Sequence, residues 1–229
     1  MLDRRFARVG LLALLLGGGS GIAQAGDYEE GGYVAPDGLS CVWNFVRNFS
    51  HNQYYYTYDY LFTSSNNSYT DNMDFSYYCG HGSPYWISQY DYSTDLSKAG
   101  RYSHKGYGNA DLEFIAFHSC KVVPGPWERS DWWTPWVNYR GIFDGLHQAL
   151  GFRTDAYIAS APDISYDFGR AMRYNGTVWQ NWFDSIDDEG YSSEHGCAVM
   201  HPTCVYDSYY SWAADPPSGH TNLTVWWQY

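Results

Sequence analysis

The stretch DLEFIAFHSC, residues Asp111–Cys120, decides the predicted fold. Leu112–Phe117 is an almost continuous apolar run, which is typical of a strand buried on both faces of a parallel sheet. The run ends at Cys120, and the glycine- and proline-containing loop KVVPGPW follows. Because α/β proteins place functional groups at the carboxyl ends of parallel strands, Cys120 is a candidate functional residue.

A second buried segment, Met73–Cys79, ends just before His81 and Gly82 in the sequence YYCGHGSPYWI. A histidine in a turn is by itself weak evidence of function. If the two strands are neighbours, however, His81 and Cys120 face one cleft. Nucleophilic catalysis by cysteine and histidine requires such a pair within reach of each other.

A helix is expected between two buried strands. Ile142, Leu146 and Leu150 recur at helical spacing in Gly141–Phe152, and Gly151 is a plausible C-cap. In this helix His147 is interpreted as a packing residue. Tyr157–Ser160 is the next buried segment. A strand, a helix and a strand predict a βαβ crossover, and therefore an α/β fold with a mostly parallel sheet flanked by helices.

The remaining segments complete one predicted domain over residues 26–229. Two further strands are expected, one at Ser40–Phe49, where apolar residues alternate, and one at Asn222–Tyr229. A further helix is expected at Val178–Ile186, where apolar residues recur at helical spacing. Residues 26–38 are rich in glycine, acidic residues and tyrosine, and are expected to form a loose N-terminal arm. No internal repeat or linker divides the chain.

Residues 1–25 resemble a secretory signal peptide. Three arginines precede the short apolar run Leu11–Leu16, and Ala23-Gln24-Ala25 provides small residues at a cleavage site. The apolar run is too short for a stable transmembrane helix. We expect cleavage after Ala25, a secreted or periplasmic location, and no membrane insertion after signal removal.

The charge of the mature chain limits the classes of partner that it is expected to bind. Removal of residues 1–25 leaves 10 basic and 24 acidic residues, a net charge of −14. Nucleic acids and anionic membranes attract positive potential, so neither is an expected partner. The remaining expectation is a peptide or protein substrate, with no cofactor.

The chain contains 24 tyrosines, 11 tryptophans and 11 phenylalanines. Aromatic side chains either line a groove for sugars and extended peptides or supply core and sheet surface, and the second use is the more frequent. The loop PWERSDWWTPWVNY follows Cys120. Its Trp132, Trp133 and Trp136 are candidates for binding substrate; the alternative is that they plug the end of the sheet.

Five cysteines leave one unpaired thiol if the others form disulfides, as is expected after export. Cys197 and Cys204 form a natural local pair, and Cys41 with Cys79 is a second candidate pair, which leaves Cys120 free. The competing arrangement pairs Cys79 with Cys120 and removes the nucleophile.

The segment HGCAVMHPTC allows another interpretation, a zinc site made of His195, Cys197, His201 and Cys204. Their spacing is irregular and export favours oxidation. The disulfide is therefore the preferred expectation, and no metal site is predicted.

Two blocks resemble the caspase–gingipain–legumain superfamily of cysteine peptidases. FSYYCGHG, Phe75–Gly82, matches a hydrophobic strand ending in His-Gly, and FIAFHSC, Phe114–Cys120, matches a second strand ending in a small residue and the nucleophilic cysteine. GLHQALGF is similar to the glycine-bounded helix that follows the nucleophile in gingipain-like members. The similarity covers roughly Phe75–Ala161 and is shared with a bacterial exported branch of this superfamily.

The resemblance implies a caspase-hemoglobinase-like fold and a secreted hydrolase that acts on peptide or amide bonds. Cys120 is then the nucleophile and His81 the acid/base, while the N–H groups of Gly82 and Cys120 stabilise the oxyanion, each contributing about 3 kcal/mol. Glycine at position 82 is expected to let the backbone approach the reacting carbonyl.

One position departs from the superfamily pattern. Many members have Gln-Ala or Glu-Ala before the cysteine, whereas this chain has His118-Ser119. The position two before the cysteine shapes the pocket for the residue that precedes the cleaved bond, which makes His118 a candidate for binding substrate. The specificities of caspases for Asp and of legumains for Asn do not carry over. Two alternatives remain: a binding protein for carbohydrates or peptides, and an inactive member of the fold.

Overall fold

The computed structural model describes residues 28–97, 106–137, 142–174, 176–217 and 222–229. Its centre is a seven-stranded sheet with the order β10-β9-β8-β7-β3-β1-β2. Neighbouring strands from β2 to β8 pair in parallel, while β9 pairs antiparallel with both β8 and β10. The prediction of a mostly parallel α/β sheet flanked by helices is therefore confirmed.

The strands of this sheet are β1 (Glu30–Val34), β2 (Asn52–Tyr56), β3 (Phe75–Cys79), β7 (Phe114–His118), β8 (Gln148–Phe152), β9 (Gly196–Met200) and β10 (Thr224–Trp227). A small second sheet consists of β4 (Gly82–Ser83), β5 (Trp86–Ser88) and β6 (Ser93–Asp95). The helices are α1 (Leu39–Val46), α2 (Asp59–Phe62), α3 (Thr134–Val137), α4 (Ala161–Ala171) and α5 (Val178–Glu189), with 3-10 turns at Asn66–Ser68 and Pro202–Cys204.

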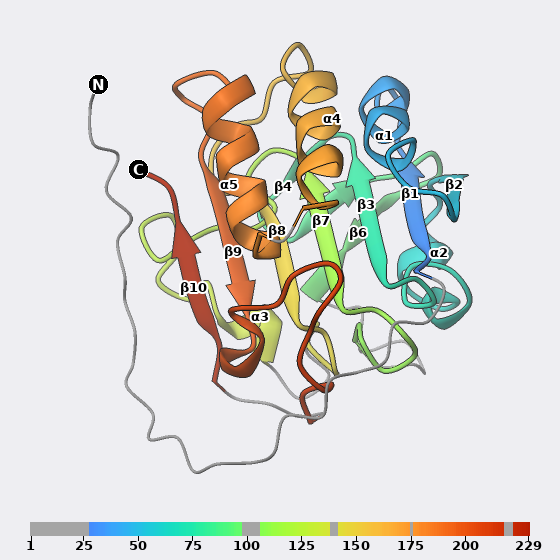
Figure 1. Cartoon of the computed structure of the whole chain (residues 1–229), viewed down its shortest axis with the longest axis vertical. Coiled ribbons are helices and arrows are strands. Elements are labelled where there is room, and N and C mark those ends of the chain that lie inside the picture. Colours follow the sequence, from blue (N-terminus) through green and yellow to red (C-terminus); the bar gives the residue numbers. More distant parts are fainter. Residues whose placement is uncertain (1–27, 98–105, 138–141, 175, 218–221) are drawn as a thin grey trace.

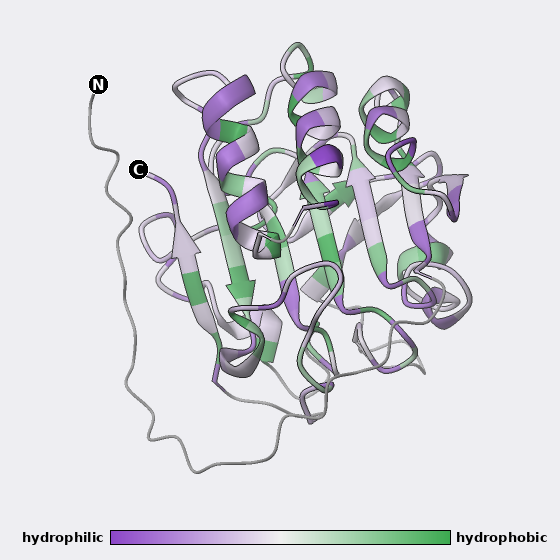
Figure 2. Cartoon of the chain, in the orientation of Figure 1, coloured by the Kyte–Doolittle hydropathy of each residue, from purple (hydrophilic) through white to green (hydrophobic). Residues whose placement is uncertain are grey.

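Both faces of the main sheet are covered. Figure 1 shows α5, α4 and α1 side by side over one face, and their apolar residues form one buried cluster with that face. A second buried cluster on the other face includes residues of the small sheet, α2 and α3. β3, β7, β8 and β9 are buried at every position, and Figure 2 shows hydrophobic stretches in β7, β8 and β9. Burial on both faces explains why polar and apolar residues do not alternate regularly in these strands.

Two expectations for the N-terminal part are wrong. Residues 30–38 are not a loose arm, because β1 lies inside the sheet between β2 and β3 and is fully buried. Residues 40–49 are not a strand, since α1 spans Leu39–Val46. Cys41, Val42, Phe45 and Val46 are buried at helical spacing, whereas Trp43, which strand alternation would place on the same side as Cys41 and Phe45, is 51% exposed.

Gly32 explains how closely α1 packs on β1. A Cβ atom at this position would lie 2.5 Å from Val42 Cγ1 and 2.7 Å from Val46 Cγ1. Such distances are far inside van der Waals contact, so the helix can sit on the strand only where the strand lacks a side chain.

The helix expected over Gly141–Phe152 is also absent. Within the described residues of that range, Gln148–Phe152 is β8, and Gly145 has a φ of 122°, which interrupts a helix. Ile142 and Leu146 are buried in the segment before β8 and Leu150 within it, so their helical spacing is a coincidence. His147 therefore precedes a strand and is no helix-packing residue. The predicted C-cap Gly151 lies within β8.

Tyr157–Ser160 forms a turn, not a strand, and leads into α4. The sequence contains the signals of this missed helix: proline in the first turn, Asp163 near the start, Arg170 near the end, and buried Ile164 and Phe168 four residues apart. The predicted helix over Val178–Ile186 is confirmed as α5, and the predicted C-terminal strand is confirmed as β10.

The predicted signal peptide, residues 1–25, lies outside the described residues. Among the helices that the described segments contain, none combines the length and the apolar character needed to cross a bilayer.

A buried carboxyl group at the start of β1 makes stability depend on pH. Glu30 is 1% exposed, and burial together with the charge of Asp74 raises its pKa to about 9. The native state therefore binds more protons than the unfolded state between pH 4.5 and about 9, so the stabilisation present at low pH is lost as pH rises through this window.

We expect Glu30→Gln to reduce this pH-dependent loss of unfolding free energy by about 1–3 kcal/mol, because glutamine stays uncharged in the core at every pH. Urea unfolding at pH 5 and pH 8.5 measures the effect. The matched control is Glu189→Gln, at an exposed position in α5. An equal pH dependence in wild type and Glu30→Gln would contradict the assignment.

Candidate active site

His81 and Cys120 follow neighbouring strands, as the sequence analysis required. β3 and β7 pair in parallel, with Cys79 beside His118. His81 and Cys120 each lie two residues beyond that pair. The Gly80 N–H donates to the His118 carbonyl oxygen at 3.2 Å, which continues the pairing past the strand ends. The two candidate residues therefore leave the same edge of the sheet side by side.

One cavity of about 290 Å³ lies at this edge, and both His81 and Cys120 line it. Its walls come from the segment after β1, the N-terminal ends of α1 and α4, and the turn before α4. The lining residues are Pro36, Asp37, Gly38, Ser40, Cys41, Cys79, Gly80, His81, His118, Cys120, Ala156, Tyr157, Ile158 and Ala161. Two helix N-termini at a cavity favour a negative charge within it, such as a thiolate.

The backbone around Cys120 holds the thiol in place. The Cys120 Sγ atom lies 3.4 Å from both the N–H and the carbonyl oxygen of Ala156, so the thiol can donate and the thiolate can accept. Lys121, the next residue, has a φ of 57°, a conformation that costs a non-glycine residue about 1–3 kcal/mol. Its N–H donates to the Thr154 carbonyl oxygen at 2.9 Å, which fixes the sharp turn after Cys120.

His81 is exposed, and its backbone is fixed while its imidazole makes no hydrogen bond to a described residue. The His81 carbonyl oxygen accepts from the Ser88 N–H at 2.9 Å and from the Tyr78 hydroxyl at 3.0 Å. These bonds anchor the start of the β4–β5 hairpin beside the cavity. The imidazole is therefore available to a bound molecule.

Gly82 pairs with Ile87 in this hairpin. The bond from Ser88 N–H to His81 makes Gly82–Ile87 a non-hydrogen-bonded pair of the ladder, so the Gly82 N–H points away from β5. The reason for glycine differs from the one expected: a Cβ atom would lie 2.2 Å from Ser119 Oγ and 2.7 Å from the Trp86 carbonyl oxygen. Close packing of the hairpin on the segment before Cys120 requires glycine here.

The cysteine pairing resolves one open alternative and corrects one expectation. Cys41 and Cys79 form a disulfide bond, whereas Cys120, Cys197 and Cys204 are free. The alternative Cys79–Cys120 bond is therefore excluded. The preferred Cys197–Cys204 bond is wrong, because Cys197 belongs to the buried cluster on the sheet face opposite α5, while Cys204 lies in the turn beyond β9.

A chain of buried hydrogen bonds fixes the protonation state of His118. The Ser165 hydroxyl donates to the Ala161 carbonyl oxygen at 2.5 Å, so its oxygen accepts from the Tyr77 hydroxyl at 2.6 Å. Tyr77 has then used its only proton, and its oxygen accepts from His118 Nδ1 at 2.9 Å. His118 thus carries its proton on Nδ1, and Nε2 holds a lone pair.

His118 is 3% exposed, and burial lowers its pKa to about 3, which keeps the ring neutral. Its Nε2 atom is buried and accepts no hydrogen bond from a described residue. A lone pair of this kind in a cavity wall is costly unless a bound molecule or water donates to it. This is a physical reason to retain His118 as a candidate for contact with substrate.

The three tryptophans that were candidates for binding substrate lie away from the cavity that His81 and Cys120 line. Trp132, Trp133 and Trp136 are not among the residues that line it. Trp136 is fully buried in the cluster on the opposite sheet face, Trp132 packs against that cluster, and Trp133 is 49% exposed. Of the two interpretations weighed, packing against the sheet describes Trp136 and Trp132.

Sequence reasoning missed the cavity walls contributed by 36–38 and by 156–158. One signal was present at the first wall: Pro36, Asp37 and Gly38 form a turn, in which Asp37 has a φ of 70°. The second wall carries no comparable motif, since its position depends on α4, which was itself missed.

Comparisons with known proteins bear on the whole of this region. No curated protein matches the chain. One family model, described as a domain of unknown function (DUF6345), matches residues 44–214, which include His81, Cys120 and most of the sheet. The chain therefore belongs to the DUF6345 family.

Proposed function

We propose that the protein is a secreted cysteine hydrolase that cleaves peptide or amide bonds, with Cys120 as nucleophile and His81 as acid/base. One observation carries the proposal: a free thiol and an imidazole without a hydrogen bond to any described residue follow adjacent parallel strands at the same level and line one cavity. The Cys41–Cys79 disulfide supports export, since such bonds persist in oxidising compartments.

In this mechanism the Cys120 thiolate attacks the carbonyl carbon of the substrate and forms a tetrahedral intermediate. The N–H groups of Gly82 and Cys120 are the proposed donors to its oxyanion. His81 then donates its proton to the departing amine, which leaves a thioester on Cys120. A water molecule that loses its proton to His81 hydrolyses the thioester and restores the thiol.

The caspase-like fold remains part of the proposal. The ordered pair of strands that end in His81-Gly82 and in Cys120 supports it, and so does their adjacency in a mostly parallel sheet. His118 occupies the position that shapes the pocket before the cleaved bond in that superfamily. Its neutral, lone-pair-bearing Nε2 suits a substrate side chain that donates a hydrogen bond.

Thiol labelling of the native protein tests the proposal. We expect iodoacetamide to modify Cys120 and to spare Cys197 and Cys204, which are fully buried. We also expect His81→Ala to slow the labelling of Cys120 about tenfold at neutral pH, because the imidazolium stabilises the thiolate. Peptide mapping by mass spectrometry locates the label. Absence of a reactive Cys120 thiol in the folded protein would overturn the proposed function.

The alternative, a binding protein without chemistry, has one supporting observation of its own. Tyr56, Tyr58, Tyr60 and Tyr90 are exposed and lie in mutual ring contact at the β2 edge of the sheet. Tyrosine surfaces of this kind suit sugars. Glycan-array binding that Tyr58→Ala removes, in a protein whose Cys120 is unreactive, would favour this alternative.

A further inference from the structure

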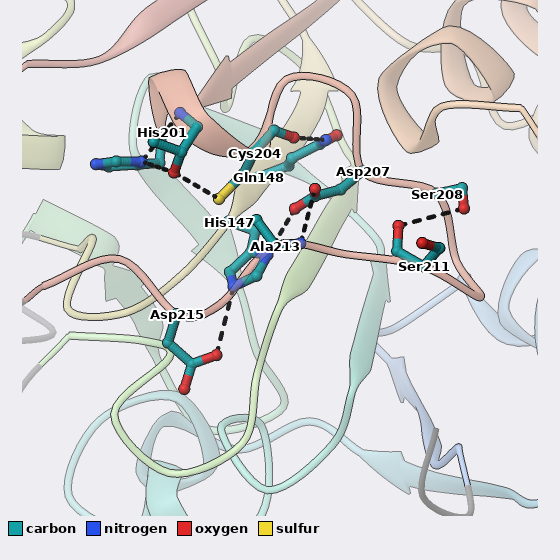
Figure 3. A network of polar contacts seen from close by, with 10 residues as sticks. His147, Gln148, His201, Cys204, Asp207, Ser208, Ser211, Ala213 and Asp215 are labelled. Atoms are coloured by element: carbon teal, nitrogen blue, oxygen red, sulfur yellow. Dashed lines mark hydrogen bonds and ion pairs between the residues drawn. The ribbon is translucent and has the colours of Figure 1, made fainter. Parts of the chain in front are cut away.

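A second group of chemically active side chains lies at the opposite end of the sheet from the Cys120 cavity. His147 immediately precedes β8, and Cys204 and Asp207 belong to the segment that follows β9. Figure 3 shows the three side chains converging. One ligand atom from each lies within 4.8 Å of the others, and all three residues are buried.

Backbone contacts hold these residues on rigid supports. The His147 N–H donates to the Glu113 carbonyl oxygen, and its own carbonyl oxygen accepts from the His201 N–H, both at 2.9 Å. Gln148 Nε2 donates to the Cys204 carbonyl oxygen at 2.7 Å. Because each contact joins the end of the sheet to its neighbours, the positions of the side chains are set before any ligand binds.

Hydrogen bonds also orient the carboxylate. Asp207 Oδ1 accepts from the Ala213 N–H at 3.0 Å, and Asp207 Oδ2 lies 2.7 Å from His147 Nδ1. Carboxylates that are held in this way, next to an imidazole, are typical of both the ligands of metal ions and their immediate surroundings.

Acidic groups surround the imidazole of His147. Asp207 is 5% exposed and lies on the Nδ1 side of the ring, while Asp215, which is 69% exposed, lies on the Nε2 side. Buried charges require partners, and a divalent ion supplies two positive charges at one point.

The spacing also fits a metal of moderate size. Around a tetrahedral zinc ion with bonds of about 2.0–2.3 Å, neighbouring ligand atoms are about 3.3–3.7 Å apart. The three buried ligand atoms, within 4.8 Å of one another, need to move by no more than about 1–1.5 Å.

We propose that His147, Cys204 and Asp207 bind a divalent metal ion of the zinc class. Nitrogen, sulfur and oxygen donors together favour zinc over magnesium or calcium, which prefer oxygen alone. The ion fastens the segment that carries Cys204 and Asp207 to the start of β8. Its role is structural, since all three ligands are buried.

The proposed site replaces both interpretations of HGCAVMHPTC. Among the described residues, Cys204 is the only member of the earlier set of four that lies in the metal-ligand cluster. Its partners, His147 and Asp207, are 57 residues before it and 3 residues after it in the sequence. This ligand set also departs from the expectation of no metal.

Cobalt binding to the full chain tests the proposal. The protein carries Cys120→Ser, so that the cavity thiol contributes nothing, and is stripped of metal with a chelator before Co²⁺ is added. We expect one equivalent of Co²⁺ to produce a thiolate-to-cobalt charge-transfer band, and Zn²⁺ to displace it. Elemental analysis of the untreated protein should give about one zinc per chain.

Variants separate the ligands from other buried groups. In the same background, Cys204→Ser should abolish the band, and His147→Gln should weaken Co²⁺ binding by at least about 100-fold. Cys197→Ser removes the other buried thiol and should leave the band unchanged. Asp215→Asn changes a side chain that is 69% exposed and is not a proposed ligand, so it should fold and keep the band.

Two results would overturn the proposal. One is a folded, chelator-treated protein that gives no charge-transfer band with Co²⁺. The other is a band that persists in folded Cys204→Ser or disappears in Cys197→Ser. Circular dichroism establishes that each variant is folded. The thiol reactivity of Cys120 plays no part in this test, so either proposal can fail alone.

Discussion

Cys120→Ala should lower the rate of peptide-amide cleavage by at least about 10⁴-fold, because removing a catalytic nucleophile eliminates the covalent pathway and leaves only binding and oxyanion stabilisation. His81→Ala should lower the rate by about 10²–10⁴-fold, the usual contribution of a general acid and base. Both side chains line the cavity, and neither belongs to a disulfide bond. Among the described residues, the hydrogen bonds that these changes would remove are those between Cys120 and Ala156. The folded structure is therefore expected to survive both changes.

The measurement is cleavage of a mixed-sequence peptide library, followed by mass spectrometry of the products. Two matched controls exist in the chain. His51→Ala changes an exposed histidine that does not line the Cys120 cavity, and Cys197→Ala removes a thiol on the opposite sheet face. Full activity in Cys120→Ala would refute the role of Cys120, whereas equal losses in His81→Ala and His51→Ala would refute the role of His81.

Loss of the Cys41–Cys79 disulfide should lower the free energy of unfolding by about 4 kcal/mol. The two cysteines are 38 residues apart, and closing a loop of that length removes about this much entropy from the unfolded chain. Because domains are stable by about 5–15 kcal/mol, the loss leaves little margin. We expect Cys41→Ala/Cys79→Ala to unfold at far lower urea concentration than wild type.

Reductant supplies the control for this prediction. Dithiothreitol should lower the urea midpoint of wild type and leave that of the double variant unchanged, because the bond it reduces is already absent. The disulfide also forms part of the cavity wall, so alkylation of Cys120 should change in rate when it is lost. A double variant as stable as the oxidised wild type would contradict the prediction.

The sequence predicted the central strands and the pair of candidate residues because both depend on local pattern. β3 and β7 are apolar runs with clear ends, and the carboxyl ends of adjacent parallel strands meet at one edge. The helix α5 could also be predicted, because polar residues on its outer face separate the apolar residues at the helical period. The Cys41–Cys79 bond was an open alternative, which only the fold resolved.

Two of the errors arose where the apolar residues fit a strand and a helix equally well. In α1 the alternation of Cys41, Trp43 and Phe45 resembled a strand, while the helical pattern of its buried residues was equally present. β8 has both faces covered, so periodicity could not distinguish it from a helix. The tautomer of His118 depends on Tyr77 and on Ser165 in α4, a chain of contacts that no local pattern contains.

The order of the cysteines along the chain has a consequence for oxidative folding. Cys41, Cys79 and Cys120 line one cavity, so the disulfide bond between the first two shares this cavity with the free thiol of the third. On the proposed export, the chain is translocated from its N-terminus, so Cys41 and Cys79 reach the oxidising compartment before Cys120. Early formation of the Cys41–Cys79 bond would then leave Cys120 without a partner, and the order of translocation would protect the proposed nucleophile from disulfide formation.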